Sequence, residues 1–137
     1  MAKVGHATTK GHVLIVEDEI GILSALALLL EMEDYSTTQA TDGRQGLAAV
    51  AASRPDVIVT DFMMPWMSGT EMIRRLREDP QYRDIPIILI SAVAAKDTGA
   101  EELIDAYLRK PPNVDRLCEL VAVAVEQGRE GLRRRFS

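Results

Sequence analysis

Reactive side chains stand directly after short apolar runs at four points of the sequence. Glu17 and Asp18 follow a run rich in Val, Ile and Leu, and Asp61 closes a second such run. Ser91 closes a third run, and Lys110 follows a short fourth one. If these ends meet, three carboxylates repel one another unless a cation compensates them. Mg²⁺ binds a few carboxylates together with waters and phosphate oxygens, so the pattern predicts a magnesium site that handles a phosphoryl group.

The charges of this predicted site balance. Three carboxylates, one Mg²⁺ and Lys110 sum to zero, and an aspartate carboxylate is able to accept a phosphoryl group as an aspartyl-phosphate. Taken singly, the residues also have plain structural roles: Asp18 as a helix cap, Lys110 as a solvated lysine and Ser91 as a loop hydroxyl. Asp61 is harder to explain in this way, because it follows an apolar run with no basic neighbour in sequence. The prediction of a magnesium and phosphoryl site therefore depends on these residues occurring together.

The elements that position these residues alternate between apolar runs and helical patterns. The predicted strands are 12–17, 35–40, 57–61, 86–91 and 106–109. The predicted helices are 19–32, 43–53, 69–78, 96–104 and 113–127, with Ser68 and Asn113 as N-caps and a capping box formed by Ser68 and Glu71. Alternating units of this kind predict an α/β fold with helices on both faces of a parallel sheet. Ligands of such sheets bind beyond the carboxyl ends of the strands.

Composition and charge narrow the function classes. The 137 residues are 47% hydrophobic and 27% charged, as in one globular domain, and the net charge of −5 disfavours a nucleic-acid binder. Residues 1–10 lack the apolar core of a secretory signal, and the most apolar stretch is too short for a bilayer span. We therefore expect a cytoplasmic protein without membrane contact. Cys118 lies among helix-spaced apolar residues and is predicted to be a buried thiol.

Four ordered motifs resemble those of the receiver domains of two-component response regulators, from Val13 to about Glu126. The motifs are Val16-Glu17-Asp18-Glu19, Asp61-Phe62-Met63-Met64-Pro65 with Gly69 downstream, Ser91-Ala92, and Tyr107-Leu108-Arg109-Lys110-Pro111. The resemblance, closest to stand-alone chemotaxis regulators, implies a flavodoxin-like (βα)5 three-layer sandwich. It also implies a parallel sheet of strand order 2-1-3-4-5.

The resemblance implies a role for each matching residue of the acidic group. Asp61 would be the phosphoacceptor. Asp18 would bind Mg²⁺ directly, Glu17 would help through water, and the backbone carbonyl of Met63 would be a further metal ligand.

The remaining matches imply contacts with the phosphoryl group and a switch. Ser91 would hydrogen-bond a phosphoryl oxygen, and Lys110 would form an ion pair with the group. The bond from Lys110 to Pro111 resembles the cis peptide of the family. Ser91 would also move toward the phosphoryl group and free the space into which the switch residue Tyr107 turns.

The resemblance also implies the partners. The phosphoryl group would come from a sensor histidine kinase, a histidine phosphotransfer protein or both, and an unknown target protein would receive the signal. The chain would catalyse only its own phosphorylation and dephosphorylation. Met63 and Val93 are apolar and cannot orient an attacking water, which predicts a long-lived phosphoryl state.

Other readings and departures from the family pattern stay open at this point. An aspartate-nucleophile phosphatase would usually carry a second aspartate where this chain has Met63, and an interaction module that is never phosphorylated would usually lack a site residue. No segment after Glu126 is long enough for a helix-turn-helix output domain.

Pro112 and the segment 101–106 differ from the usual pattern of the family. The sequence therefore does not predict the shape of the surface that would pass the signal to a target protein.

Three segments are expected along the chain: a flexible N-terminal segment 1–11, the receiver domain 12–127 and a basic C-terminal tail 128–137. The tail holds Arg129, Arg133, Arg134, Arg135 and Phe136. It is interpreted as a frayed, solvated helix end, with docking onto an acidic partner or onto the acidic rim of the chain's own site as the alternative. The helix 19–32 is apolar beyond one face, and Ile22 or Leu29 is expected to extend an apolar patch for a phosphodonor protein.

Overall fold

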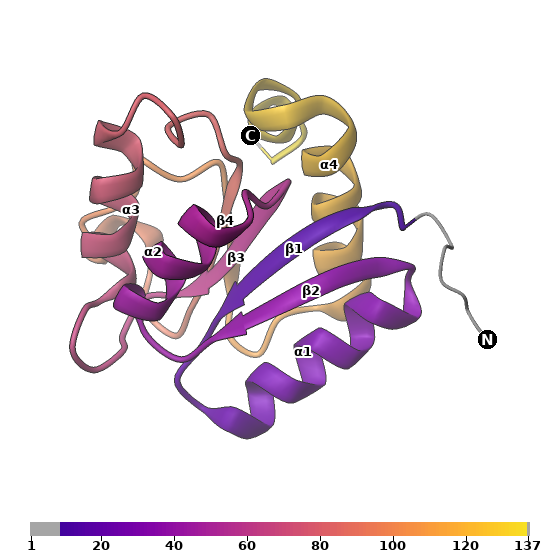
Figure 1. Cartoon of the computed structure of the whole chain (residues 1–137), viewed down its shortest axis with the longest axis horizontal. Coiled ribbons are helices and arrows are strands. Elements are labelled where there is room, and N and C mark those ends of the chain that lie inside the picture. Colours follow the sequence, from indigo (N-terminus) through magenta and orange to yellow (C-terminus); the bar gives the residue numbers. More distant parts are fainter. Residues whose placement is uncertain (1–8, 137) are drawn as a thin grey trace.

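A five-stranded parallel sheet forms the centre of the computed structural model, which describes residues 9–136 (Figure 1). The strands are β1 (Gly11–Val16), β2 (Tyr35–Ala40), β3 (Val57–Asp61), β4 (Ile87–Ser91) and β5 (Ala106–Arg109). Their order is β2-β1-β3-β4-β5, and every neighbouring pair is parallel. This confirms the predicted flavodoxin-like sheet.

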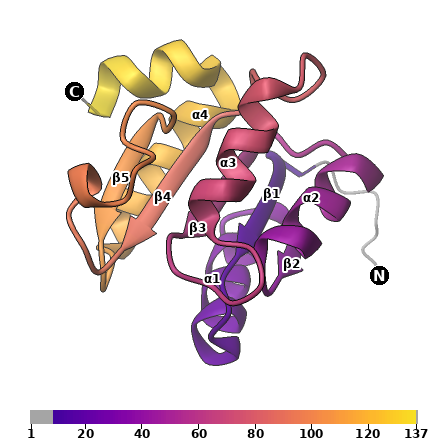
Figure 2. The same cartoon turned by 90° about the vertical axis from the view of Figure 1, so that its left-hand side faces the viewer.

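Within residues 9–136, four α-helices cover the two faces of the sheet. They are α1 (Ile20–Met32), α2 (Gly43–Ala52), α3 (Gly69–Glu78) and α4 (Val114–Phe136). Helices α1 and α4 pack on one face, and α2 and α3 pack on the other (Figures 1 and 2). Each face of the sheet packs against its pair of helices in a separate hydrophobic core. Successive residues of β1, β3 and β4 point alternately into these two cores. Because both faces are buried, the sequences of these strands are continuous apolar runs.

The predicted helix caps are present, but one of them differs in detail. Ser68 accepts a hydrogen bond from the Glu71 amide at 3.2 Å, and Asn113 accepts one from the Arg116 amide at 2.9 Å. The Glu71 carboxylate pairs with Arg75 rather than returning to the cap, so only half of the predicted capping box forms.

The prediction of a helix over 96–104 is wrong. Only a 3₁₀ turn, η2 (Ala95–Asp97), forms in this segment, and turns continue from it toward β5. Thr98 donates its hydroxyl to the Ala95 carbonyl at 2.7 Å and accepts from the Ala100 amide, which offers the backbone an alternative to helix. Gly99 then adopts a φ of 75°, which an α-helix does not allow.

The C-terminal part of α4 also differs from the expected solvated tail. Gly128, with φ 70° and ψ −163°, breaks the helix, and residues 129–136 form a second helical stretch that turns back toward β5 (Figure 2). Leu132 within this stretch is fully buried against the core beside α1 and α4. The N-terminal boundary differs as well, because Gly11 belongs to β1. Residues 1–8 of the predicted flexible segment lie outside the described residues.

Helix α1 buries Leu23, Leu26, Ala27 and Leu30. Ile22 and Leu29 are half-buried, and the most exposed apolar side chains of α1 are instead Ile20, Leu28 and Met32.

Cys118 on α4 is half-buried rather than fully buried. Burial raises the pKa of its thiol, which keeps it protonated. Within the described residues, no helix is both long and apolar enough to cross a membrane.

Candidate functional site

The acidic residues predicted from the sequence meet at the carboxyl end of the sheet. Asp61 is the last residue of β3, and Glu17 and Asp18 directly follow β1, its neighbour in the sheet. One carboxylate oxygen from each of the three lies within 4.8 Å of the others. Glu17 and Asp61 are only 3% and 8% exposed, whereas Asp18 is exposed. The cluster is therefore buried on two sides and open to solvent on the third.

Lys110 joins two of these carboxylates. Its ammonium nitrogen, Nζ, lies 3.0 Å from Glu17 Oε1 and 3.1 Å from Asp61 Oδ2. Burial lowers the pKa of Lys110, but the hydrogen bonds and charges of the two carboxylates outweigh burial and raise it overall. Lys110 is therefore charged at neutral pH, and Lys110–Pro111 is the predicted cis peptide bond.

The electrostatics of the cluster favour a divalent cation. Burial raises the pKa of Glu17, the charge of Asp61 raises it further, and the Glu19 amide and Lys110 oppose these effects. Three carboxylates against one ammonium leave two negative charges uncompensated. Hard carboxylate oxygens with one solvent-facing side suit Mg²⁺, which keeps several of its waters. The residues present thus fit the predicted metal.

The loop between β3 and α3 holds Asp61 in place through its backbone. Asp61 Oδ1 accepts a hydrogen bond from the Phe62 amide at 2.7 Å, and the Gly69 amide donates to the Phe62 carbonyl at 2.9 Å. A Cβ atom on Gly69 would lie 2.2 Å from the Asp61 carbonyl oxygen, which is rigid backbone. Only glycine allows this approach.

Replacing Gly69 with alanine is therefore expected to displace the Asp61 backbone and to lower the free energy of unfolding by about 1–3 kcal/mol. Urea unfolding measures the loss. Gly21→Ala is the matched control, because Gly21 is exposed on α1 and its Cβ would meet only a flexible Glu19 oxygen at 3.3 Å. Equal stabilities of the two variants would contradict the close approach.

Ser91 and Tyr107 are connected through the loop after β4. Ser91 is 2% exposed, and its hydroxyl accepts a hydrogen bond from the Val93 amide at 3.1 Å. The half-buried Tyr107 donates its hydroxyl to the Val93 carbonyl. Both side chains therefore bond the backbone of the same residue, Val93. Ser91 is also tied to the acidic site, since its carbonyl accepts from the Lys110 amide at 2.9 Å.

Met63 lies in the loop after Asp61, with its side chain 67% exposed. The role of its carbonyl as a metal ligand stays a prediction. The same loop carries Trp66, which is 79% exposed and lies against Arg44 at 5.0 Å from ring centroid to guanidinium carbon.

Sequence reasoning missed a second charged cluster, centred on Asp105 just before β5. The carboxylate of Asp105 is fully buried and pairs with three arginines, Arg77, Arg129 and Arg133. An aspartate between Ile104 and Ala106, at the start of a predicted strand, was the only signal of it in the sequence.

Comparisons with known proteins agree on the class of the chain. The family model described as "Response regulator receiver domain" matches residues 13–122. The polar-differentiation response regulator DivK of Brucella anthropi is 35% identical over 114 residues, which are 80% of this chain and 91% of DivK. The chain spans about half the length of the transcriptional regulators that it matches.

Solved structures show the same fold. The chemotaxis response regulator CheY4 of Vibrio cholerae aligns with a TM-score of 0.78 and 30% identity, covering 85% of this chain and 99% of CheY4. The receiver domain of the sensor histidine kinase PA1611 from Pseudomonas aeruginosa aligns with a TM-score of 0.78 at 24% identity, covering 84% and 97% of the two chains. That domain has a magnesium ion coordinated in its active-site cleft.

Proposed function

The chain belongs to the response regulator receiver domain family, and from this premise we propose that it accepts a phosphoryl group on Asp61 in a Mg²⁺-dependent reaction and signals by protein–protein contact. The observation that carries the proposal is the position of Lys110 Nζ between Glu17 and Asp61, within a cluster of three converging carboxylates. The chain acts as catalyst only toward its own Asp61.

The proposed reaction is an in-line transfer from a phosphohistidine. An oxygen of Asp61 forms a bond to phosphorus while the bond from phosphorus to the donor nitrogen breaks. Asp18, Glu17 and Asp61 would hold Mg²⁺, which supplies positive charge for the phosphoryl oxygens. Lys110 would give a further positive charge beside Asp61, and the Ser91 hydroxyl would donate to a phosphoryl oxygen once it leaves Val93.

The donor in this proposal is a sensor histidine kinase or a histidine phosphotransfer protein, as the receiver family and its relatives suggest. The output is the response of Tyr107 to the movement of Ser91, through their shared contact with Val93. The surface around Tyr107 is thus the proposed site of contact with a target protein.

Binding of beryllium fluoride, which mimics a phosphoryl group, tests the proposed chemistry. The single tryptophan, Trp66, lies in the loop after Asp61, so its fluorescence should change when Mg²⁺ and beryllium fluoride bind together. We expect a saturable change in the wild type and none in Asp61→Asn. An unchanged wild-type signal, with no binding by calorimetry, would favour an interaction module that is not phosphorylated.

Replacing Asp18 with asparagine is expected to weaken Mg²⁺ binding by at least about tenfold, because one of three ligand charges is lost. A Mg²⁺ titration followed by Trp66 fluorescence or calorimetry measures the affinity. Glu19→Gln is the control, since Glu19 lies in the same loop but outside the carboxylate cluster. A similar loss in both variants would mean that net charge alone attracts the ion.

The phosphorylated state is expected to persist for minutes or longer in the purified protein. Met63 and Val93 lie two residues after Asp61 and Ser91, at positions that influence water access in the receiver family, and their apolar side chains cannot orient an attacking water. Replacing Met63 with glutamate should shorten the lifetime by supplying a carboxylate near the phosphoryl group. Phosphoprotein remaining after removal of the donor gives the lifetime, and loss within seconds in the wild type would be inconsistent with this expectation.

A further inference from the structure

The segment Arg129–Phe136 of α4 folds back toward the start of β5 (Figure 2), and we call it the C-terminal strap. Gly128 makes the fold possible, because its φ of 70° and ψ of −163° belong to a region that only glycine adopts readily. The strap reaches the start of β5, an edge strand that pairs only with β4 among the strands that the structure describes. An unpaired edge is a template for another chain unless a helix or loop covers it.

One end of the strap is fixed by charge. Arg129 and Arg133 each place Nε 2.9 Å from Asp105 Oδ1. Arg133 also donates through Nη2 to the carbonyls of Glu102 and Ile104, both at 3.2 Å. These contacts hold the strap on the backbone that leads into β5.

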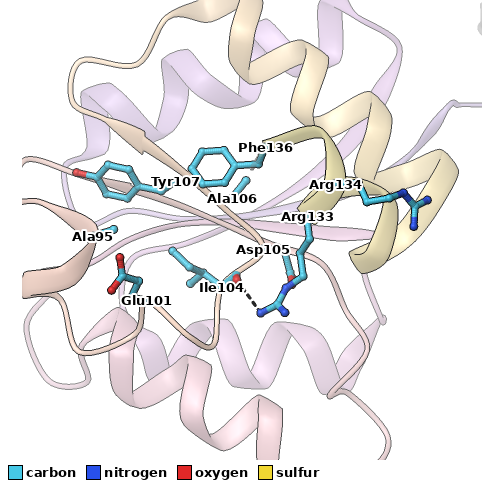
Figure 3. A pocket seen from close by; sticks show the side chains of 9 residues that line it. All are labelled: Ala95, Glu101, Ile104, Asp105, Ala106, Tyr107, Arg133, Arg134 and Phe136. Atoms are coloured by element: carbon cyan, nitrogen blue, oxygen red, sulfur yellow. Dashed lines mark hydrogen bonds and ion pairs between the residues drawn. The ribbon is translucent and has the colours of Figure 1, made fainter.

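The tip of the strap is held by an ion pair as well as by apolar contacts. Arg135 donates to the Glu119 carboxylate of α4. Leu132, between Arg129 and Arg133, is fully buried, and Phe136 at the tip is 39% exposed. Phe136 lines a groove of about 410 Å³ together with Ala106 and Tyr107 of β5 (Figure 3). Figure 3 shows the Phe136 ring beside Ala106, and the Tyr107 ring extending away from Phe136. Tyr107 forms another part of the wall of the groove that the tip of the strap lines.

We propose that the C-terminal strap is a regulatory cover over the start of β5, and that phosphorylation of Asp61 opens it by moving the Tyr107 ring out of the groove that it shares with Phe136. This inference rests on the proposed function. When the Tyr107 ring turns away, the groove around Phe136 loses part of its wall while the Asp105 contacts remain. The tip is then held mainly by the Arg135–Glu119 pair and loosens first. The open strap exposes the start of β5 and the groove as the contact surface for the target protein.

Amide hydrogen exchange of the full chain tests the proposal. Exchange of residues 130–136 is expected to rise at least about fivefold on adding Mg²⁺ and beryllium fluoride, with the amides of residues 117–124 unchanged. Trp66 fluorescence in the same samples reports whether beryllium fluoride binds. Binding without faster strap exchange overturns the strap proposal and leaves the proposed function intact.

Two sets of variants test the strap without the phosphoryl mimic. Tyr107→Ala removes the wall of the groove and should raise strap exchange at least about fivefold, whereas Tyr107→Phe should raise it less. Arg133→Gln should also raise it, whereas Arg134→Gln removes the same charge from a residue paired with exposed Glu130 and should not. Wild-type exchange in both Tyr107→Ala and Arg133→Gln would overturn the proposal even if beryllium fluoride fails to bind.

Discussion

Replacing Lys110 with alanine is expected to slow the phosphorylation of Asp61 by about 10²–10³-fold, the usual effect of removing one preorganised donor from developing charge. Lys110 Nζ lies 3.1 Å from the acceptor carboxylate, and the hydrogen bonds that it donates to Glu17 and Asp61 hold it there. Without it, Asp61 and the phosphoryl oxygens lose a positive charge in a poorly solvated site. The rate of phosphoprotein formation from acetyl phosphate and Mg²⁺ measures the effect.

Two further variants separate this role from general effects. Lys110→Arg keeps the charge but not the compact ammonium, so we expect an intermediate rate. Lys96→Ala removes an exposed lysine near η2 and should leave the rate unchanged. A Lys110→Ala rate within a few-fold of wild type, in a protein that melts normally, would show that the metal alone stabilises the transferred group.

Replacing Asp105 with alanine is expected to lower the free energy of unfolding by about 3–5 kcal/mol, as for a broken buried ion pair. Asp105 Oδ2 accepts from Arg77 at 2.8 Å and from the Ile87 amide at 2.9 Å, and the Arg77 side chain is only 8% exposed. The pKa of Arg77 is already lowered to about 10, first by burial and further by Arg129 and Arg133, against the opposing effect of Asp105. Without Asp105, the buried guanidinium of Arg77 loses the carboxylate with which it pairs.

Urea unfolding of Asp105→Ala and Glu71→Ala measures this effect against an exposed pair. Glu71 pairs with Arg75 one helical turn away, with its side chain 44% exposed, so its loss should cost only about 0.5 kcal/mol. If Asp105→Ala is no less stable than Glu71→Ala, the buried ion pairs of Asp105 do not stabilise the fold more than an exposed pair does.

The sheet and the phosphorylation site follow from local patterns in the sequence. Strands buried on both faces leave continuous apolar runs such as 57–61, which are easy to recognise. Parallel strands bring their carboxyl ends to one edge, so Asp18, Asp61 and Lys110 were predicted to converge without knowledge of any contact. The roles of Ser91 and Tyr107 came instead from the family resemblance.

The segments that were predicted wrongly depend on backbone details or on distant contacts. Gly99 and Gly128 adopt positive φ values that no sequence pattern distinguishes from an ordinary loop or helix glycine. The strap also depends on Asp105, which lies 24 residues from Arg129 and 28 from Arg133 in sequence. Helical periodicity carries no information on such a pairing, so the arginines were interpreted as solvated.

Intact-mass spectrometry after incubation with acetyl phosphate and Mg²⁺ tests the central claim most directly. We predict that the wild-type chain gains the mass of one phosphoryl group, and that Asp61→Ala and a metal-free sample gain none. The same adduct in Asp61→Ala, or an unmodified wild-type chain under conditions that phosphorylate a known receiver, would contradict the assignment of Asp61 as the phosphoacceptor.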